Sequence, residues 1–232
     1  MKVYRQQNFD VDGAKLGPGV YADYEFDRCT FSCPPFAFPR HPRDRPVVRR
    51  ATLINCDLHG QRVNAFIAEE CLIENLKTQA LLWIHGAIFN HVVLRGAFGR
   101  LMFTEWFVGG GDEETEKRKA IFARADEAYY EHVDWALDIR EAEFHECEFR
   151  YVPGHLVRRD PETQGLIWRD KLLQHDWNRA DFPLSGWGVD LDLFIESKLS
   201  SVVIVAGKRH PKFKRQLEEL KELRELGVVE PD

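Results

Sequence analysis

Apolar and polar residues recur with a period of five along the middle of the chain. Every fifth residue from Leu53 to Phe103 is apolar except Thr78, whereas the register from Asn55 to Glu105 is almost entirely polar. An α-helix repeats near 3.6 residues and a strand near 2, so neither keeps a strict period of five on one side. A chain that turns a corner every five residues keeps such a period. The pattern therefore predicts short extended segments around a filled interior, stacked at the spacing of β-strands.

The same spacing recurs on both sides of this block. It places aromatic and aliphatic residues five apart upstream and downstream, at Tyr21, Phe26, Phe31, Ile139, Phe144 and Phe149. Four fragments resemble the signature of pentapeptide-repeat proteins: Ala51-Thr52-Leu53, Cys56-Asp57-Leu58, Ala142-Glu143-Phe144 and Cys147-Glu148-Phe149. The resemblance covers roughly residues 19–31, 51–105 and 137–151, and it implies a short right-handed quadrilateral β-helix, a mainly β solenoid. An irregular β-sheet or a different β-solenoid is the alternative.

We expect the repeats to form one domain over residues 1–151. Two insertions interrupt the repeats within this domain. The first, at about 32–50, begins with five prolines in residues 32–46 and is predicted to be a loop. The second, at about 104–136, opens with glycines and continues with acidic residues followed by basic ones. This order suits the helix dipole and predicts an exposed helix near 112–132.

The pentad pattern ends after Tyr151, and residues 152–232 are predicted to form a mixed α/β cap. Asp160 followed by Pro161 is typical of a helix start. Residues 201–206 are predicted to form a buried strand, and residues 211–226 a helix with one apolar side. We expect this tail to pack against the repeats and cover an otherwise open edge.

The distribution of charge limits the kinds of partner. Most of the acidic excess behind the formal net charge of -6 lies in residues 107–149, and no basic stripe follows the chain. Direct binding of nucleic acid is therefore disfavoured. Six acidic residues are candidates for contact with a basic protein partner, although a solvated face is the simpler interpretation. They are Asp112, Glu113, Glu114, Glu116, Glu143 and Glu148.

Motifs for catalysis, cofactors and metals are absent from the sequence. It contains no nucleophile elbow, dinucleotide fingerprint or phosphate loop, and its five cysteines form no C-x-x-C pair. We therefore expect no cofactor and no metal. No apolar segment is long enough to span a membrane and no leader is evident, so a cytoplasmic protein is expected.

The leading hypothesis is a non-enzymatic protein-binding module. The pentapeptide-repeat proteins that the chain resembles include immunity and resistance factors, which bind a toxin or a topoisomerase. Mimicry of DNA towards a topoisomerase is one alternative, which the nearly neutral segment 20–106 weakens. The other is an enzyme with its site between the repeats and the tail, where Arg158, Arg159 and Asp160 would clamp a ligand beside the carboxylates near Glu143. Those three residues most simply belong to a helix cap.

Overall fold

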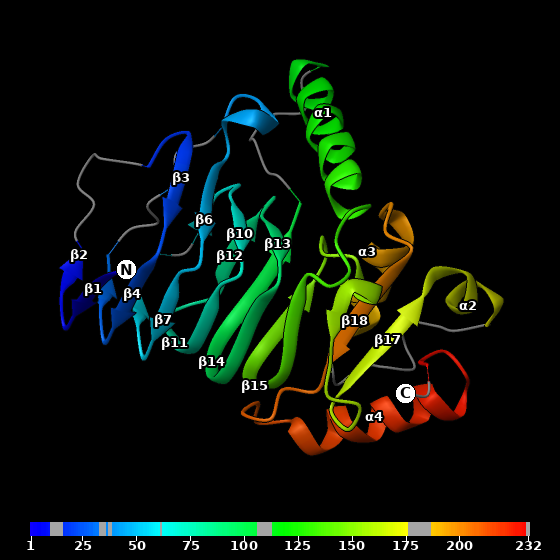
Figure 1. The fold of residues 1–232 in the computed structure, drawn as a ribbon. Helices are drawn as coiled ribbons and strands as arrows, with labels where there is room; N and C mark the ends of the chain where they lie inside the picture. Colours follow the sequence, from blue (N-terminus) through cyan, green and yellow to red (C-terminus); the bar gives the residue numbers. More distant parts are fainter. Residues whose placement is uncertain are drawn as a thin grey trace.

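A computed structural model shows how the strands and helices are arranged (Figure 1). It describes residues 1–9, 16–32, 36, 39–60, 62–105, 113–175 and 187–230. The N-terminal two thirds form parallel sheets, and the C-terminal third packs as helices and a short ribbon at one end of them.

The largest sheet has 12 strands and is curled into a half-barrel. Its main path runs, in spatial order, through β1 (Lys2–Arg5), β4 (Tyr24–Asp27), β7 (Thr52–Ile54), β11 (Leu72–Thr78), β14 (Val92–Thr104), β12 (Leu82–His85) and β9 (Arg62–Val63). Joined to this path are β2 (Asn8–Phe9), β5 (Thr30–Phe31), β8 (Asp57–Leu58), β15 (Leu137–Phe149) and β16 (Val157–Arg158). All of these strands pair in parallel.

Two smaller sheets complete the β structure. A four-stranded parallel sheet follows the order β13 (Ile88–Asn90), β10 (Ile67–Glu69), β6 (Pro46–Arg49) and β3 (Gly19–Ala22). An antiparallel pair consists of β17 (Gln164–Trp168) and β18 (Ser201–Val205). Pro46 is the first residue of its strand, a position at which a missing N–H is tolerated.

The described part of the chain contains four α-helices. They are α1 (Glu113–Tyr130), α2 (Arg169–Gln174), α3 (Trp187–Glu196) and α4 (Phe213–Glu225), and single 3-10 turns occur at Pro42–Asp44 and Gly154–Leu156. In Figure 1, α1 stands beside one end of the strands, whereas the other three helices gather around β17 and β18. None of the described helices is long and apolar enough to cross a membrane.

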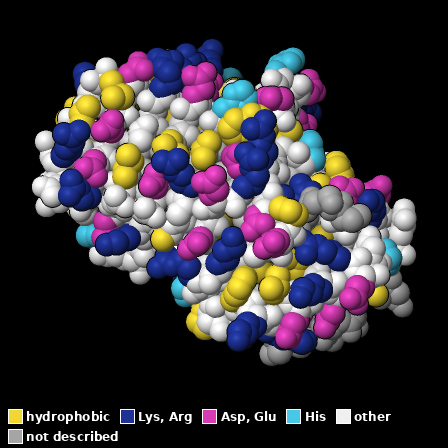
Figure 2. Space-filling model, turned by 60° about the horizontal axis from the view of Figure 1, so that its bottom comes forward, with side chains coloured by type: hydrophobic (Ala, Val, Ile, Leu, Met, Phe, Trp, Pro, Cys, Tyr) yellow, Lys and Arg dark blue, Asp and Glu magenta, His cyan; other side chains and the backbone are white. Residues whose placement is uncertain are grey.

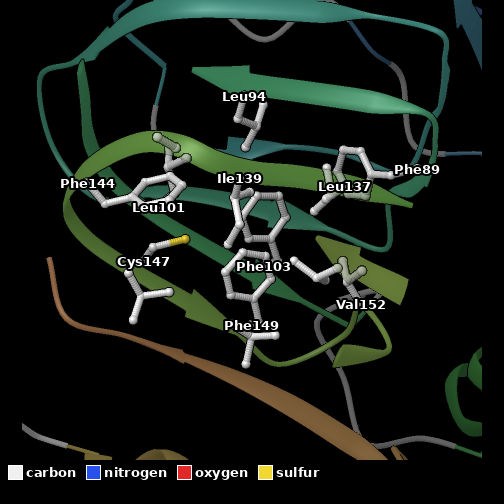
Figure 3. Close-up of a cluster of buried hydrophobic side chains, with 14 of the residues drawn as sticks. Phe89, Leu94, Leu101, Phe103, Leu137, Ile139, Phe144, Cys147, Phe149 and Val152 are labelled. Carbon is white, nitrogen blue, oxygen red and sulfur yellow. The ribbon is translucent and has the colours of Figure 1, made fainter. Parts of the chain in front are cut away.

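Stacked aromatic side chains fill the interior of the curled sheet (Figure 3). The rings of Phe103 and Phe149 stack with centroids 4.8 Å apart, and those of Phe98 and Phe144 lie 5.3 Å apart. All four side chains are almost completely buried. Because the same cluster continues into Leu220 of α4, the sheet and the tail share one hydrophobic core.

The predicted right-handed β-helix of pentapeptide-repeat type is wrong. The protein is a mixed α/β fold whose large parallel sheet curls into a half-barrel, and it is not a solenoid of square coils. Strands β14 and β15 are each 13 residues long and pair along most of their length, so the chain does not turn a corner every five residues there. Large side chains explain the difference, because Leu76 and Leu101 occupy the interior at positions where the repeat needs a small residue.

Most predicted elements outside the repeats are found. Helix α1 lies within the predicted 112–132, strand β18 within 201–206 and helix α4 within 211–226. The helix start at Asp160 is wrong, because a turn leads directly into β17. The backbone N–H of Asp160 donates a hydrogen bond to the side chain of Gln164 within this turn. The division into domains 1–151 and 152–232 stays a prediction.

The tail covers the edge of β15, as expected. Leu137 and Asp138 of β15 pair with β16. Further along the same edge, other groups of the tail donate hydrogen bonds to carbonyls of β15. The side chain of Gln164 donates to the carbonyl of Ile139 at 3.0 Å, and the backbone N–H of Arg209 donates to that of Phe144 at 3.1 Å. The Arg209 guanidinium also reaches the carbonyl of Phe98 at 2.9 Å. The tail thus satisfies backbone groups that an open edge would expose.

Candidate functional site

The acidic residues of the α1 region do not form a free acidic surface. Glu113, Glu114 and Glu116 are exposed, and each pairs with a basic residue of the same helix. The N···O distances are 2.6 Å to Lys117, 3.0 Å to Arg118 and 3.0 Å to Lys119 respectively. Such exposed pairs within a helix contribute only about 0.3–0.5 kcal/mol each. Asp112 lies outside the described residues.

Other carboxylates are also paired with arginines. Arg50 donates to Asp23 at 2.7 Å, Arg49 to Glu69 at 2.6 Å and Arg95 to Glu74 at 2.8 Å, each from a neighbouring strand or turn. Figure 2 shows acidic and basic side chains interspersed over one face of the molecule. The arrangement on this face is unlike the continuous negative charge that mimicry of DNA requires.

Two residues of the predicted clamp, Arg158 and Asp160, have different partners within the protein, and the clamp of Arg158, Arg159 and Asp160 stays a prediction. The Arg158 guanidinium lies over the ring of Trp135, 4.2 Å from its centroid. Asp160 accepts hydrogen bonds from Glu162 N and Thr163 Oγ1 and pairs with Lys208 at 2.9 Å. These bonds to Asp160 hold the pKa of its carboxyl below the usual range, although burial opposes them. Asp160 therefore organises a turn.

The structure separates Glu143 from Glu148, although both lie on β15. Their neighbours Phe144, Cys147 and Phe149 point into the core, so both glutamates point away from it. Glu143 is exposed, whereas helix α3 lies over Glu148 and leaves its side chain only 15% exposed. Glu148 is thus the member of the predicted set that enters an enclosed site.

That site is a cleft between β15 and α3, at the junction of the sheet and the tail. Its volume is about 240 Å³. Its lining combines carboxyl groups, one arginine and apolar side chains: Glu146, Cys147, Glu148, Arg150, Trp187, Val189, Asp190, Val205, His210 and Gln216.

Strand periodicity explains why three polar side chains of one segment meet there. Glu146, Glu148 and Arg150 are spaced two apart at the end of β15 and so share a face. Helix α3 supplies Asp190 from the opposite wall, and the buried ring of Trp187 fixes the first turn of this helix against the sheet. The site therefore forms only when the tail docks.

Arg150 joins two carboxyl groups from opposite walls of the cleft. Its Nη2 donates to Glu148 Oε2 and, at 3.0 Å, to Asp190 Oδ1. The two carboxyl groups are also close enough for each to influence the ionisation of the other.

Burial and mutual repulsion favour one proton on this pair of carboxyl groups at neutral pH. Burial raises the pKa of Glu148 to about 8, and the charge of Asp190 adds to the effect, whereas Arg150 opposes it. Burial also raises the pKa of Asp190. Two carboxylates in such a site cannot both ionise easily, so the pair behaves as one group that holds one proton.

Two residues of the tail line the remaining wall. The His210 ring packs against that of His145 with centroids 5.4 Å apart, and burial lowers the pKa of His210, so its imidazole is neutral at pH 7. Gln216 is buried and accepts a hydrogen bond from Gly207 N at 3.0 Å.

A second buried polar cluster is structural. Arg45 and Asp126 form a two-pronged ion pair, with Nη2 to Oδ2 at 2.9 Å, and both side chains are more than nine-tenths buried. The hydroxyl of Tyr151 donates to the same carboxylate, and the Arg45 guanidinium lies over the Phe122 ring. This cluster fastens α1 to the sheet.

In the described part of the chain, neither the cysteine thiols nor the other side chains that commonly bind metals form a further site. Cys29, Cys56, Cys71 and Cys147 are buried and unpaired, as expected for small apolar side chains, and Cys33 lies outside it. Burial raises the pKa of the Cys147 thiol, so it is not a reactive thiolate. No group of three or more His, Cys, Asp or Glu side chains could hold a metal ion among the described residues.

Comparisons with known proteins give no match: no family model, no curated protein and no solved structure resembles the chain significantly.

Proposed function

We propose that this chain is a non-catalytic binding protein whose ligand site is the cleft between β15 and α3. The observation that supports this most is the pair of carboxyl groups of Glu148 and Asp190, which Arg150 joins in a cavity of about 240 Å³.

The stability cost of the pair supports a functional role. Partly buried ionisable groups contribute little to stability, and apolar residues of similar shape are often as stable or more so. Groups whose pKa is displaced by burial and a specific partner are enriched at functional sites. The position supports it as well, because clefts between packed units are common ligand sites.

A test is a ligand-observed NMR screen of small polar fragments, with one variant that fills the cleft. Val189 is 38% exposed on α3 and lines the cleft, so Val189→Trp should occlude it. The matched control is Val20→Trp on β3, since Val20 is also exposed but lies outside the cleft lining.

We expect fragments that bind the wild-type protein to be lost with Val189→Trp and retained with Val20→Trp. A screen without hits, or hits that survive in Val189→Trp, would exclude the cleft as a ligand site. Chemical conversion of a bound fragment would favour the enzyme instead.

The protein-binding module, of immunity or resistance type, is a second candidate. Its supporting observation is that Val189 and Leu193, one turn apart on α3, are each 38% exposed. A partner contacting this side of α3 could place a side chain in the cleft. In a pull-down from host lysate, Leu193→Glu should then release a partner that the surface control Leu226→Glu retains.

A further inference from the structure

We propose that His210 is a pH switch for the loop of residues 207–212, which joins β18 to α4. While its ring is neutral, the loop lies against β15 and closes one wall of the cleft. Protonation of the ring releases the loop and, with it, any ligand in the cleft. Only the release of a ligand rests on the proposed function, because the movement of the loop needs no ligand.

One hydrogen bond defines the form of the ring that the loop requires. The backbone N–H of Lys212 donates to His210 Nδ1 at 3.0 Å. Since a backbone N–H can only donate, Nδ1 is the acceptor and carries no proton. An imidazolium has N–H donors at both ring nitrogens, so a proton on Nδ1 would face a second donor and break this bond. The turn at the start of α4 therefore needs a neutral ring.

The ring lies where the loop meets the sheet. It packs edge to face against the ring of His145 on β15, with centroids 5.4 Å apart, and it lines the cleft. The residue before it, Arg209, donates its backbone N–H to the carbonyl of Phe144 at 3.1 Å. A ring that turns away from Lys212 N would therefore disturb both the bond to β15 and the wall of the cleft.

The groups around the ring disfavour a positive charge on it. Four titratable groups act on it from the sheet and the loop: His145 and Glu146 of β15, Arg100 of β14 and Lys212. Glu146 is the only carboxylate of the four, and it already forms an ion pair with Arg100. Burial and the cationic neighbours lower the pKa of His210, whereas Glu146 opposes them.

Other charged groups nearby are engaged elsewhere. Lys208 of the loop pairs with Asp160 at 2.9 Å, and the Arg209 guanidinium donates to the carbonyl of Phe98 at 2.9 Å. The remaining charged residues of the cleft lining bond to one another: Glu148, Arg150 and Asp190. None of these interactions supplies a new acceptor for a proton on His210 Nδ1.

The direction of the pH dependence follows from the lowered pKa. The docked loop binds the proton of His210 less tightly than a released loop, in which the imidazole has its ordinary pKa of about 6.5. The contribution of the ring to docking is thus complete above that value and is lost as pH falls through the pKa of the docked form.

Amide hydrogen exchange, measured by NMR between pH 7.5 and 4.5, tests the switch without a ligand. The titration of the His210 ring is followed together with the protection of the Arg209 amide. We expect this protection to fall at least about tenfold in step with protonation of the ring, while amides of β17 and β18 remain protected. Protection of the Arg209 amide that persists after the ring has taken up its proton would overturn the proposal.

His210→Asn separates the proton on this ring from other effects of acid. The Oδ1 of asparagine occupies the place of Nδ1 and can accept from Lys212 N, but it does not take up a proton in this range. The Arg209 amide should then keep its protection within about threefold down to pH 4.5. An equal loss in this variant and in the wild type would contradict the switch.

The matched control is His41→Asn. His41 Nδ1 also accepts from the backbone two residues later, Arg43 N, at 3.3 Å, but it does so in an exposed turn outside the cleft lining. This variant should lose protection of the Arg209 amide as the wild type does. If His210→Asn does not fold, the ¹⁵N chemical shift of His210 Nδ1 in the wild type decides instead: a protonated Nδ1 at pH 7.5 would refute the proposal.

Release of a ligand is measured with uncharged fragments that bind the cleft at pH 7.5. We expect them to bind at least about tenfold more weakly to the wild type once His210 is protonated, and to bind His210→Asn equally at both pH values. Equal binding to the wild type would show that the loop does not control the cleft. If no fragment binds at any pH, the proposed function is wrong, and amide exchange still decides whether the switch exists.

Discussion

The side-chain oxygen of Asn75 occupies the space in which residue 96 would carry a Cβ atom. A Cβ on Gly96 would lie 2.3 Å from Asn75 Oδ1, and that oxygen accepts a hydrogen bond from Ala97 N at 2.8 Å. The pairing of β11 with β14 shifts register at this point, so Asn75 faces an extra residue on β14. Gly96 also has a φ of +74°, which favours glycine.

Gly96→Ala should therefore destabilise the protein by roughly 2–3 kcal/mol, because a left-handed backbone and a clash with Asn75 act together. Equilibrium unfolding in urea measures the change. The control is Gly17→Ala, where a Cβ would meet no atom within 4 Å, and it should change stability by less than about 0.5 kcal/mol. Equal effects of the two substitutions would contradict this account.

Asn75→Asp should cost about 1 kcal/mol although it changes a single atom. The carboxylate can still accept from Ala97 N, but it loses the amide that donates to Asn55 Oδ1 at 3.0 Å. The loss should be larger at pH 7 than at pH 3, because only the ionised form repels the Asn55 oxygen. Thermal unfolding of both proteins at the two pH values checks this; no difference from wild type at pH 7 would show that the Asn55 bond contributes nothing.

Asp126→Ala should be among the most damaging substitutions, at about 3–5 kcal/mol, because it leaves the buried Arg45 without a counter-charge. The double variant Arg45→Met with Asp126→Leu should recover much of that loss. Glu114→Ala removes an exposed pair on the same helix and should cost less than about 0.5 kcal/mol. Chemical denaturation ranks the three variants. If Asp126→Ala were as stable as the double variant, the unpaired charge of Arg45 would not be the main cause of the loss.

The contribution of Glu148 to stability should fall as pH rises between about 4.5 and 8. The pKa of Glu148 rises from 4.5 to about 8 on folding, so the folded protein holds this proton more tightly than the unfolded chain. Its contribution is complete below the unfolded pKa and is lost as pH rises through the folded pKa. At about 1.36 kcal/mol per pKa unit, the expected loss is up to roughly 5 kcal/mol.

Glu148→Gln isolates this contribution from those of other titrating groups. The difference in unfolding free energy between wild type and Glu148→Gln should grow with pH across that window, in favour of the variant. Glu143→Gln, which lies on the same strand in solvent, should follow wild type at every pH. Parallel curves for wild type and Glu148→Gln would mean that the pair does not hold a proton in the folded protein.

The period of five identifies much of the core but not the path of the chain. Phe98, Phe103, Phe144 and Phe149 lie at the predicted apolar positions and are buried. Leu101 is also buried between two of them, and a square coil has no room for a large residue there. The periodicity reports which side chains face inward, whereas the width of the interior depends on the summed volume of all of them.

The candidate site could be predicted only in part for a similar reason. Glu148 belongs to a visible alternation with Glu146 and Arg150, which indicates a polar strand face. Asp190 has no local feature that links it to them, because the contact with Arg150 spans 40 residues and depends on docking of α3. The helix expected at Asp160 fails likewise, since pairing of β17 with β18 outweighs a favourable cap.

The order of strand pairing has a consequence for how the chain is made. Along the main sheet, β1 pairs with β4, β4 with β7, β7 with β11, β11 with β14, and β14 with β15, so each new strand meets one already synthesised. The sheet can therefore grow strand by strand as the polypeptide leaves the ribosome. The edge of β15 is then closed in steps, first by β16 and Gln164 and last by Arg209, which reaches the carbonyls of Phe98 and Phe144. A nascent chain stalled before β16 would expose the whole free edge of β15 to its neighbours on a polysome.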